Sequence, residues 1–336
     1  MSRYAILLAV CTLLLLMSGA AVTDYNGVPE PPALLAQGHQ AAAILVGLLA
    51  LGLVIWLAAS VQPGWLKRLG WAALALLIAD GALGKRSPIF HAFLAQLFFA
   101  STVAIALFTS SGWTRGADPV KDQGWPSLRS FSSIALFLVL LQVWLGAAFR
   151  HQAAGLMPHI VGALTVALVV LIMCMFVMQQ FPEHRSLRPA ANALLAILVV
   201  QVVFGISALT ARMMSADHTL PTPLLLTTIA HVAMGAVTLA GTVVLAIHIC
   251  RHVNAAPYRS VVLEPDPRVD PASVRNIRSI VRRSPFPSIE SATTQRRPWL
   301  AGARLQDRRT AYRPPRCTRC HEKTPRGSGS AKESSS

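Results

Sequence analysis

Residues 157–180, MPHIVGALTVALVVLIMCMFVMQQ, decide the class of this protein. Apart from His159 the stretch has no ionisable side chain other than Cys174, and as a helix rising about 1.5 Å per residue it can cross the roughly 30 Å core of a bilayer. Backbone groups inside a bilayer must satisfy their own hydrogen bonds, which predicts a helix rather than a loop. Pro158 suits the start of that helix and would place His159 in its first turn.

Seven further blocks of the sequence have the same apolar character. Of the 336 residues, 54% are hydrophobic and 13% are charged, a balance that excludes an ordinary soluble domain. The first block also suits a cleaved signal peptide, because a short basic start precedes it and small residues follow it. Together the blocks predict an all-α polytopic membrane protein with eight transmembrane helices, at residues 4–22, 39–60, 67–84, 90–110, 130–149, 157–180, 189–213 and 224–250.

The charges of the loops predict an orientation for these helices. If the N-terminus is cytoplasmic, the segment before the first block and the inner loops together hold eight Lys and Arg. The outer loops hold four. Because basic residues collect on the cytoplasmic side, we expect a multi-pass protein of the cell inner (plasma) membrane with both termini cytoplasmic. The four outer exceptions are Lys85, Arg86, Arg150 and Arg212.

The C-terminal tail differs from the rest of the chain. Residues 251–336 hold 18 Lys and Arg against 7 Asp and Glu, and their Pro-, Ser- and Arg-rich composition predicts a disordered cytoplasmic tail attracted to anionic lipid. No nucleic-acid recognition motif accompanies the charge, so no specific nucleic-acid partner is expected. Residues 273–284 suit a membrane-surface helix. Cys317, Cys320 and His321 have the spacing of covalent heme attachment, but a cytoplasmic tail argues against it.

Four of the ten histidines occupy one repeated position. His39, His91, His159 and His231 each lie near the start of an even-numbered predicted helix, which places them at a similar shallow depth near the outer surface. A polar side chain within a span is costly and usually faces the bundle interior. A single such histidine is simply an interfacial residue, whereas four at matched positions indicate a shared purpose.

The odd-numbered predicted helices also share a pattern. Near their outer ends a Gln, or Asp80 in its place, precedes a Gly by four residues, and the first helix has a Gly there. The pattern predicts a hairpin repeated four times, or two pseudo-repeated four-helix bundles, and it requires the first block as a helix. The residues of the pattern are Gly19, Asp80 and Gly84, Gln142 and Gly146, and Gln201 and Gly205.

The expected divisions of the chain follow from these two halves. They are residues 1–114, a cytoplasmic linker at 115–129, residues 130–252 and the tail at 253–336.

Two histidines on facing helices of a bundle can supply both axial ligands of a heme iron. His159 and His231 are the expected pair, and small residues that follow the histidines would allow a flat macrocycle to approach closely: Gly47, Gly162 and Gly235. A zinc site would require three or four converging ligands. A second heme on the inner side is disfavoured, because no helix-embedded histidine matches His248.

Four strings carry a family resemblance. They are HAFLAQLFFASTVAIAL (residues 91–107), LQVWLGAAFRH (141–151), PHIVGAL (158–164) and AHVAMGAVTLA (230–240). Together with the two-half plan and one histidine in each even-numbered helix, they resemble the heme A synthase family over roughly residues 5–250.

The resemblance implies a membrane oxidoreductase that converts the methyl group of heme O to the formyl group of heme A during cytochrome oxidase assembly. It implies heme b between His159 and His231, substrate heme near His39 and His91 as catalytic residues, and Arg150 on a heme propionate. Implied partners are the lipid bilayer, heme, an electron donor that the sequence does not name, and heme O synthase or terminal oxidase subunits.

The N-terminal half departs from the family pattern. Ala36 and Gln40 stand where the family has a glutamate and an arginine, Thr23 replaces another arginine, and residues 23–38 contain no cysteine. The alternative is therefore a non-catalytic heme-binding membrane protein in electron transfer, heme handling or oxidase assembly. Asp80 is the one acid within an expected span, and it suits either a helix-end acid facing Lys85 or water, or a catalytic substitute.

Overall fold

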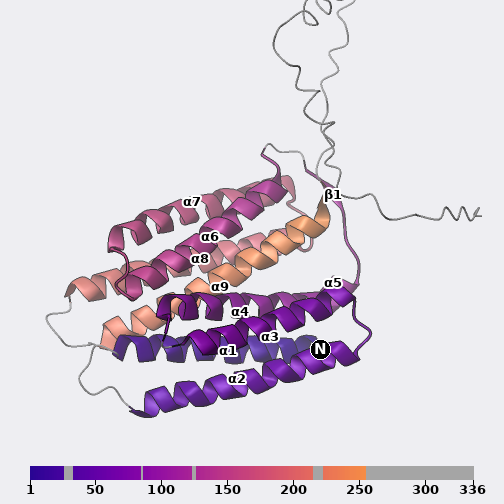
Figure 1. Cartoon of the computed structure of the whole chain (residues 1–336). Helices are drawn as coiled ribbons and strands as arrows, with labels where there is room; N and C mark the ends of the chain where they lie inside the picture. The colour runs from indigo at the N-terminus through magenta and orange to yellow at the C-terminus, as the bar shows by residue number, and fades with distance from the viewer. Residues whose placement is uncertain (26–32, 85, 123–125, 215–221, 255–336) are drawn as a thin grey trace, which may run out of the picture. The chain divides into compact units, whose positions relative to one another are not determined.

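The computed structural model describes residues 1–25, 33–84, 86–122, 126–214 and 222–254. Eight helices of twenty or more residues make up most of this part of the chain (Figure 1). A one-turn helix, α5 (Ser111–Thr114), and two short strands, β1 (Val120–Lys121) and β2 (Val253–Asn254), complete it. The long helices are α1 (Ser2–Tyr25), α2 (Ala33–Ala59), α3 (Gly64–Leu83), α4 (Pro88–Phe108), α6 (Leu128–Arg150), α7 (Leu156–Gln180), α8 (Leu187–Met214) and α9 (Thr222–His252).

Seven of these helices are long and apolar enough to cross a membrane. The exception among the described helices is α3, whose twenty residues include Lys67, Arg68 and Asp80. The prediction of an all-helical, multi-pass membrane protein is confirmed at this level.

The predicted helix positions agree with the observed ones, and the largest difference concerns α2. This helix begins at Ala33, six residues before the expected start, because Ala33, Leu34, Leu35 and Ala36 all favour helix. His39 consequently lies in the second turn of α2 instead of opening the helix.

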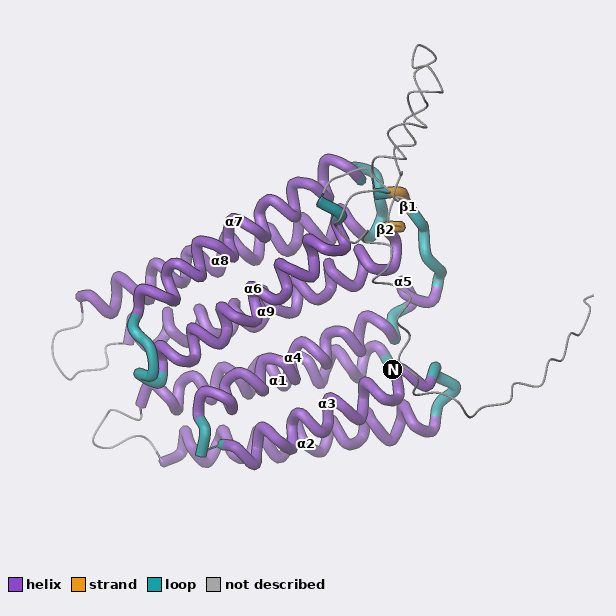
Figure 2. Tube along the Cα trace, turned by 45° about the horizontal axis from the view of Figure 1, so that its top comes forward, coloured by secondary structure: helices purple, strands orange, loops and turns teal. Residues whose placement is uncertain are grey.

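The helices form two closed rings. Helices α1, α2, α3 and α4 pack in sequence and α1 closes against α4, while α6, α7, α8 and α9 do the same with α6 against α9. Figure 2 shows the two sets side by side, with α4 and α9 adjacent. Helix α9 also packs on α1, and α4 on α6. All these contacts fall within one compact unit, Met1–Ser260.

Small side chains line the seam between the two rings. Ala9 and Leu16 of α1 and Phe99 of α4 form a buried cluster with Ala236 and Ala240 of α9. Lipid tails surround a leucine side chain just as favourably as a neighbouring helix does. Helices in a bilayer therefore associate through close packing, which small residues permit. The alanines of α9 allow this approach.

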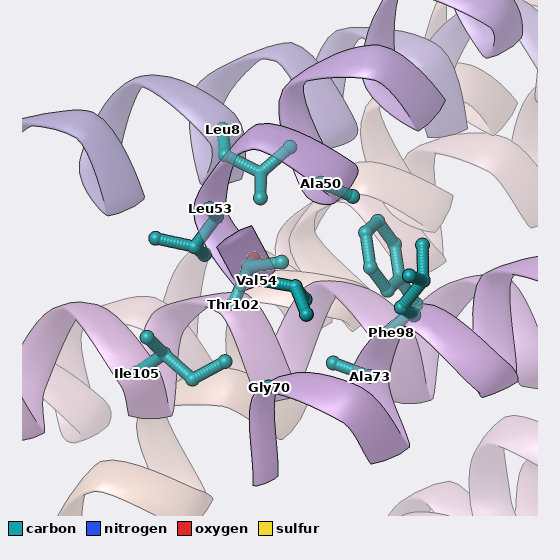
Figure 3. A pocket seen from close by; sticks show the side chains of 10 residues that line it. Leu8, Ala50, Leu53, Val54, Gly70, Ala73, Phe98, Thr102 and Ile105 are labelled. Atoms are coloured by element: carbon teal, nitrogen blue, oxygen red, sulfur yellow. The ribbon is translucent and has the colours of Figure 1, made fainter. Parts of the chain in front are cut away.

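The interior of the N-terminal ring is filled. Its cavity has a volume of about 10 Å³, no larger than one water molecule needs, and apolar side chains surround it (Figure 3). Any macrocycle held by this ring must therefore lie towards the helix ends, where the histidines are. The cavity is lined by Leu8, Ala50, Leu53, Val54, Gly70, Ala73, Leu74, Phe98, Thr102 and Ile105.

Residues of the expected linker, 115–129, pair with the first residues of the expected tail, which begins at 253. Strand β1 pairs in parallel with β2, with Val120 opposite Val253. Arg129, in the first turn of α6, donates to the carbonyls of Val253 and Cys250, at 2.7 and 2.8 Å. The linker is thus partly strand and helix, and residues 253 and 254 belong to the folded part. The other predictions for the tail concern residues that lie outside the described part.

We expect Arg129→Lys to lower the stability of the protein by about 1–3 kcal/mol, because a single ammonium cannot reproduce two hydrogen bonds made by a planar guanidinium. Thermal unfolding of the detergent-solubilised protein measures the change. Arg3→Lys is a suitable control, since no hydrogen bond or ion pair of Arg3 is found in the described residues. An equal melting temperature for the two variants would contradict the role assigned to Arg129.

Candidate functional site

Three of the four histidines lie against a glycine of the preceding helix. A Cβ atom built on that glycine would come within 2.9 or 3.0 Å of the imidazole Cε1, so the ring occupies the space where a side chain would otherwise be. The pairs are Gly19 with His39, Gly146 with His159, and Gly205 with His231. Three of the four glycines identified in the odd-numbered helices therefore accommodate an imidazole, and the fourth, Gly84, does not.

The glycines that follow the histidines have other surroundings. Gly162 faces the Gln142 side chain, and Gly235 faces Gln201 with a built Cβ 3.4 Å from Nε2. Nothing lies within 4 Å of a Cβ built on Gly47. The first two thus permit a glutamine of the preceding helix to approach, and none of the three contacts a histidine.

His91 has a carboxylate as its neighbour on the preceding helix. Its Nδ1 lies 2.9 Å from Oδ1 of Asp80 and 3.2 Å from the carbonyl oxygen of the same residue. Asp80 is buried, with 6% of its surface exposed, so it does not face water as a helix-end acid would. It occupies the position that Gln142 and Gln201 hold in their helices.

The Nδ1 atoms of the histidines face the protein. The Ser18 hydroxyl donates to the Leu15 carbonyl and lies 2.8 Å from Nδ1 of His39, so it accepts the proton of this nitrogen. Nδ1 of His91 donates to the carbonyl oxygen of Asp80 at 3.2 Å, and Oδ1 of the same residue lies at ion-pair distance, 2.9 Å, without a hydrogen bond. In both rings Nδ1 is occupied by the protein, so Nε2 is the nitrogen left to bind a metal in the neutral ring.

The C-terminal pair has amide neighbours. Gln142 Nε2 lies 2.9 Å from Nδ1 of His159 and donates to its carbonyl, while Gln142 Oε1 is buried without a partner. His231 Nδ1 and Gln201 Oε1 are also buried and unpartnered among the described residues. The bond of Gln142 Nε2 to the His159 carbonyl fixes which end of this amide faces Nδ1, since a turned amide would bring two acceptor oxygens together. Nδ1 of His159 is therefore an acceptor in this arrangement.

His159 and His231, from α7 and α9, are in ring contact within the C-terminal ring of helices. Their ring centres are 6.2 Å apart and their planes are nearly perpendicular, at 89°. Two imidazoles that each bind one metal ion through a bond of about 2 Å have ring centres on the order of 6 Å apart. The spacing therefore suits two axial ligands of a single iron. No group of three or more His, Cys, Asp or Glu able to hold a metal is found in the described residues.

The N-terminal pair is arranged less closely. His39, His91 and Asp80 are near enough to interact electrostatically, but no ring contact between His39 and His91 is found in the described part of the chain. Ala36, where the resembled family has a glutamate, is exposed, as is Gln40. The structure therefore brings together the C-terminal pair, and it places Asp80 rather than residue 36 beside the N-terminal one.

Arg150 faces the other ring. Its guanidinium bonds to Oδ1 of Asp24 at 2.6 Å and to the carbonyl oxygen of Ala20, both on α1. The Arg150 side chain is 16% exposed and already has a carboxylate partner, and its role towards a heme propionate stays a prediction. The guanidinium of Arg212 lies 5.3 Å above the ring of Phe149, which stacks on His159, so this second arginine is also near the C-terminal pair.

His151 follows Arg150 in the turn after α6. Burial, and then the positive charge of Arg150, lower the pKa of His151 below its usual value. The imidazole is consequently neutral at neutral pH, and it adds no charge to the outer end of the site.

A histidine cluster at the opposite helix ends was not predicted. The His184 and His252 rings are 4.7 Å apart, and His248 stacks on His252 at 5.8 Å. Nδ1 of His184 accepts hydrogen bonds from the backbone N–H groups of Ser186 and Leu187 and so caps the start of α8. The signal available in the sequence was the His184 position just before a helix, together with the spacing of His248 and His252 by four residues.

We expect Gly205→Ala to destabilise the protein by about 1–3 kcal/mol, because the new Cβ would lie 2.9 Å from Cε1 of His231. Gly47→Ala is the matched control, since its Cβ meets nothing within 4 Å and alanine favours helix by up to about 1 kcal/mol. Thermal unfolding in detergent compares the two. Equal effects would show that His231 is not held against Gly205.

Comparisons with protein-family models, with curated proteins and with solved structures find no match for this chain.

Proposed function

We propose that this protein is a heme A synthase-like membrane oxidoreductase, which oxidises the methyl group of heme O on the way to heme A. In this proposal His159 and His231 hold heme b, and His39 and His91 receive the substrate heme. Heme b, when bound, supplies one-electron redox chemistry. The chain provides the imidazole ligands, their orientation through Nδ1 contacts, and an apolar surround.

One observation carries the proposal. The ring centres of His159 and His231, from two different helices, are 6.2 Å apart, and each ring is accommodated by a glycine of a third or fourth helix. A histidine that only decorated a helix end would not require such a glycine. Two opposed imidazoles in a bundle interior are the ligand set of a six-coordinate heme.

We further propose that all eight long helices cross the membrane as two pseudo-repeated four-helix bundles. The supporting observation is that the contacts between the two rings are symmetric. If α1 corresponds to α6 and α4 to α9, the contact of α1 with α9 corresponds to that of α6 with α4. The contact of α4 with α9 corresponds to itself. Such a correspondence is the relation between parallel repeats about an axis along the membrane normal. The proposed location is the cell inner (plasma) membrane, with both termini cytoplasmic and heme O synthase or oxidase subunits as partners.

A second candidate is a non-catalytic heme-binding membrane protein. Two observations favour it: Ala36 carries no carboxylate, and Arg150 already pairs with Asp24, which leaves its guanidinium less free for a propionate. This candidate keeps heme at His159 and His231 and removes the reaction at the N-terminal pair.

Both candidates predict a low-spin b-type absorption spectrum for the purified protein. His159→Ala or His231→Ala should abolish that spectrum, because a six-coordinate iron loses one axial ligand. Absorption spectroscopy of the dithionite-reduced protein measures this, and His184→Ala serves as a control outside the site. A spectrum that survives both alanine variants would remove heme from this position.

Pigment analysis separates the two candidates. In cells that also express a source of heme O, the enzyme should yield heme A or its hydroxylated precursor in extracted pigments, resolved by chromatography. His91→Ala should abolish that product without removing the b-type spectrum. Heme O alone, in cells with the wild-type protein, would support the non-catalytic candidate.

A further inference from the structure

The four hairpins differ in what faces the imidazole. In the described residues His39 has a hydroxyl neighbour and His159 an amide, while His91 alone has a carboxylate, Asp80. The contact joins the outer ends of α3 and α4, and it is direct, at 2.9 Å between Oδ1 and Nδ1.

Asp80 forms one ion pair in the part of the chain that the structure describes, the one with His91, and its side chain is 9% exposed. His39 is near enough to interact with the same carboxylate electrostatically. A carboxylate removed from water is costly unless it is compensated, so this placement requires a charge partner beside it. The His91 ring, with Nδ1 at 2.9 Å from Oδ1, is the nearest such partner.

A carboxylate on Nδ1 changes what Nε2 can do. It fixes the tautomer and the orientation of the ring, and it raises the donor strength of Nε2 towards a metal more than a neutral acceptor does. In the described residues His159 has an amide in the equivalent place and Nδ1 of His231 has no partner, so the two pairs should differ in their preference for ferric iron.

We propose that Asp80 is the positioning residue of the N-terminal heme site: its carboxylate orients His91 and strengthens Nε2 as a ligand of ferric heme. The inference rests on the proposed function, and it assigns to α3 the carboxylate that α2 lacks at Ala36. Asp80 acts through His91, so it is not itself a catalytic residue.

The test is the affinity of the full-length protein for added ferric iron protoporphyrin IX. His231→Ala leaves the N-terminal site to be titrated alone, and His91→Ala leaves the C-terminal site. In the first background Asp80→Asn, which keeps the shape and loses the charge, should weaken binding by about 10- to 100-fold. In the second it should change the affinity by less than about twofold, which also reports that the protein is folded.

The midpoint potential supplies a readout that a purely structural role would not move. If Asp80→Asn weakens only ferric binding, a tenfold loss corresponds to a rise of about 59 mV for the N-terminal heme. Gln142→Glu is the converse variant: a carboxylate opposite His159 should lower the potential of the C-terminal heme. Shifts in these two directions support the inference.

The failures are distinguishable. A wild-type protein that binds heme at neither site overturns the proposed function and the inference with it. Heme bound at both sites, with an N-terminal affinity and potential unchanged by Asp80→Asn, overturns the inference alone. If Asp80→Asn also removes heme binding at the C-terminal site, the variant is misfolded and Asp80→Glu is used in its place. Heme binding at both sites of Asp80→Glu supports the role of the carboxylate. Heme binding at the C-terminal site only overturns it.

Discussion

A histidine within a long apolar helix needs space on the helix beside it, and this requirement organises the end of the protein at which His39, His159 and His231 lie. Helices in lipid gain little from burying apolar side chains against each other, so their association depends on close packing and on polar contacts. Gly19, Gly146 and Gly205 provide that space by having no side chain where an imidazole lies. The ring is then held from one side, and its second nitrogen remains available.

The two rings of helices use this arrangement differently. In the C-terminal ring, opposed imidazoles with amide neighbours form a compact pair. In the N-terminal ring the imidazoles are not in ring contact, one has a buried carboxylate as its neighbour, and the bundle interior is closed by apolar side chains. The two rings therefore offer different surroundings to an imidazole, an amide in the C-terminal ring and a carboxylate in the N-terminal one.

Much of the fold could be predicted from the sequence because a bilayer imposes length and apolarity on every crossing helix. The four histidine positions and the glycines opposite three of them were likewise visible as spacings. The contact between Asp80 and His91 was not, since it depends on how the turn between α3 and α4 sets the register of two helices. The partner of Arg150 lies 126 residues away on α1, and no local pattern indicates such a distant contact.

The ion pair between Arg150 and Asp24 also limits how far the two rings can be regarded as modules. Each ring closes on itself, which is the arrangement expected of halves that arose by duplication and could exist alone. Yet the charge at the end of α6 is neutralised from α1, and a buried guanidinium left without its partner costs several kcal/mol. The histidine pair of one ring is therefore assembled in an electrostatic environment that the other ring completes, so the two rings are interdependent.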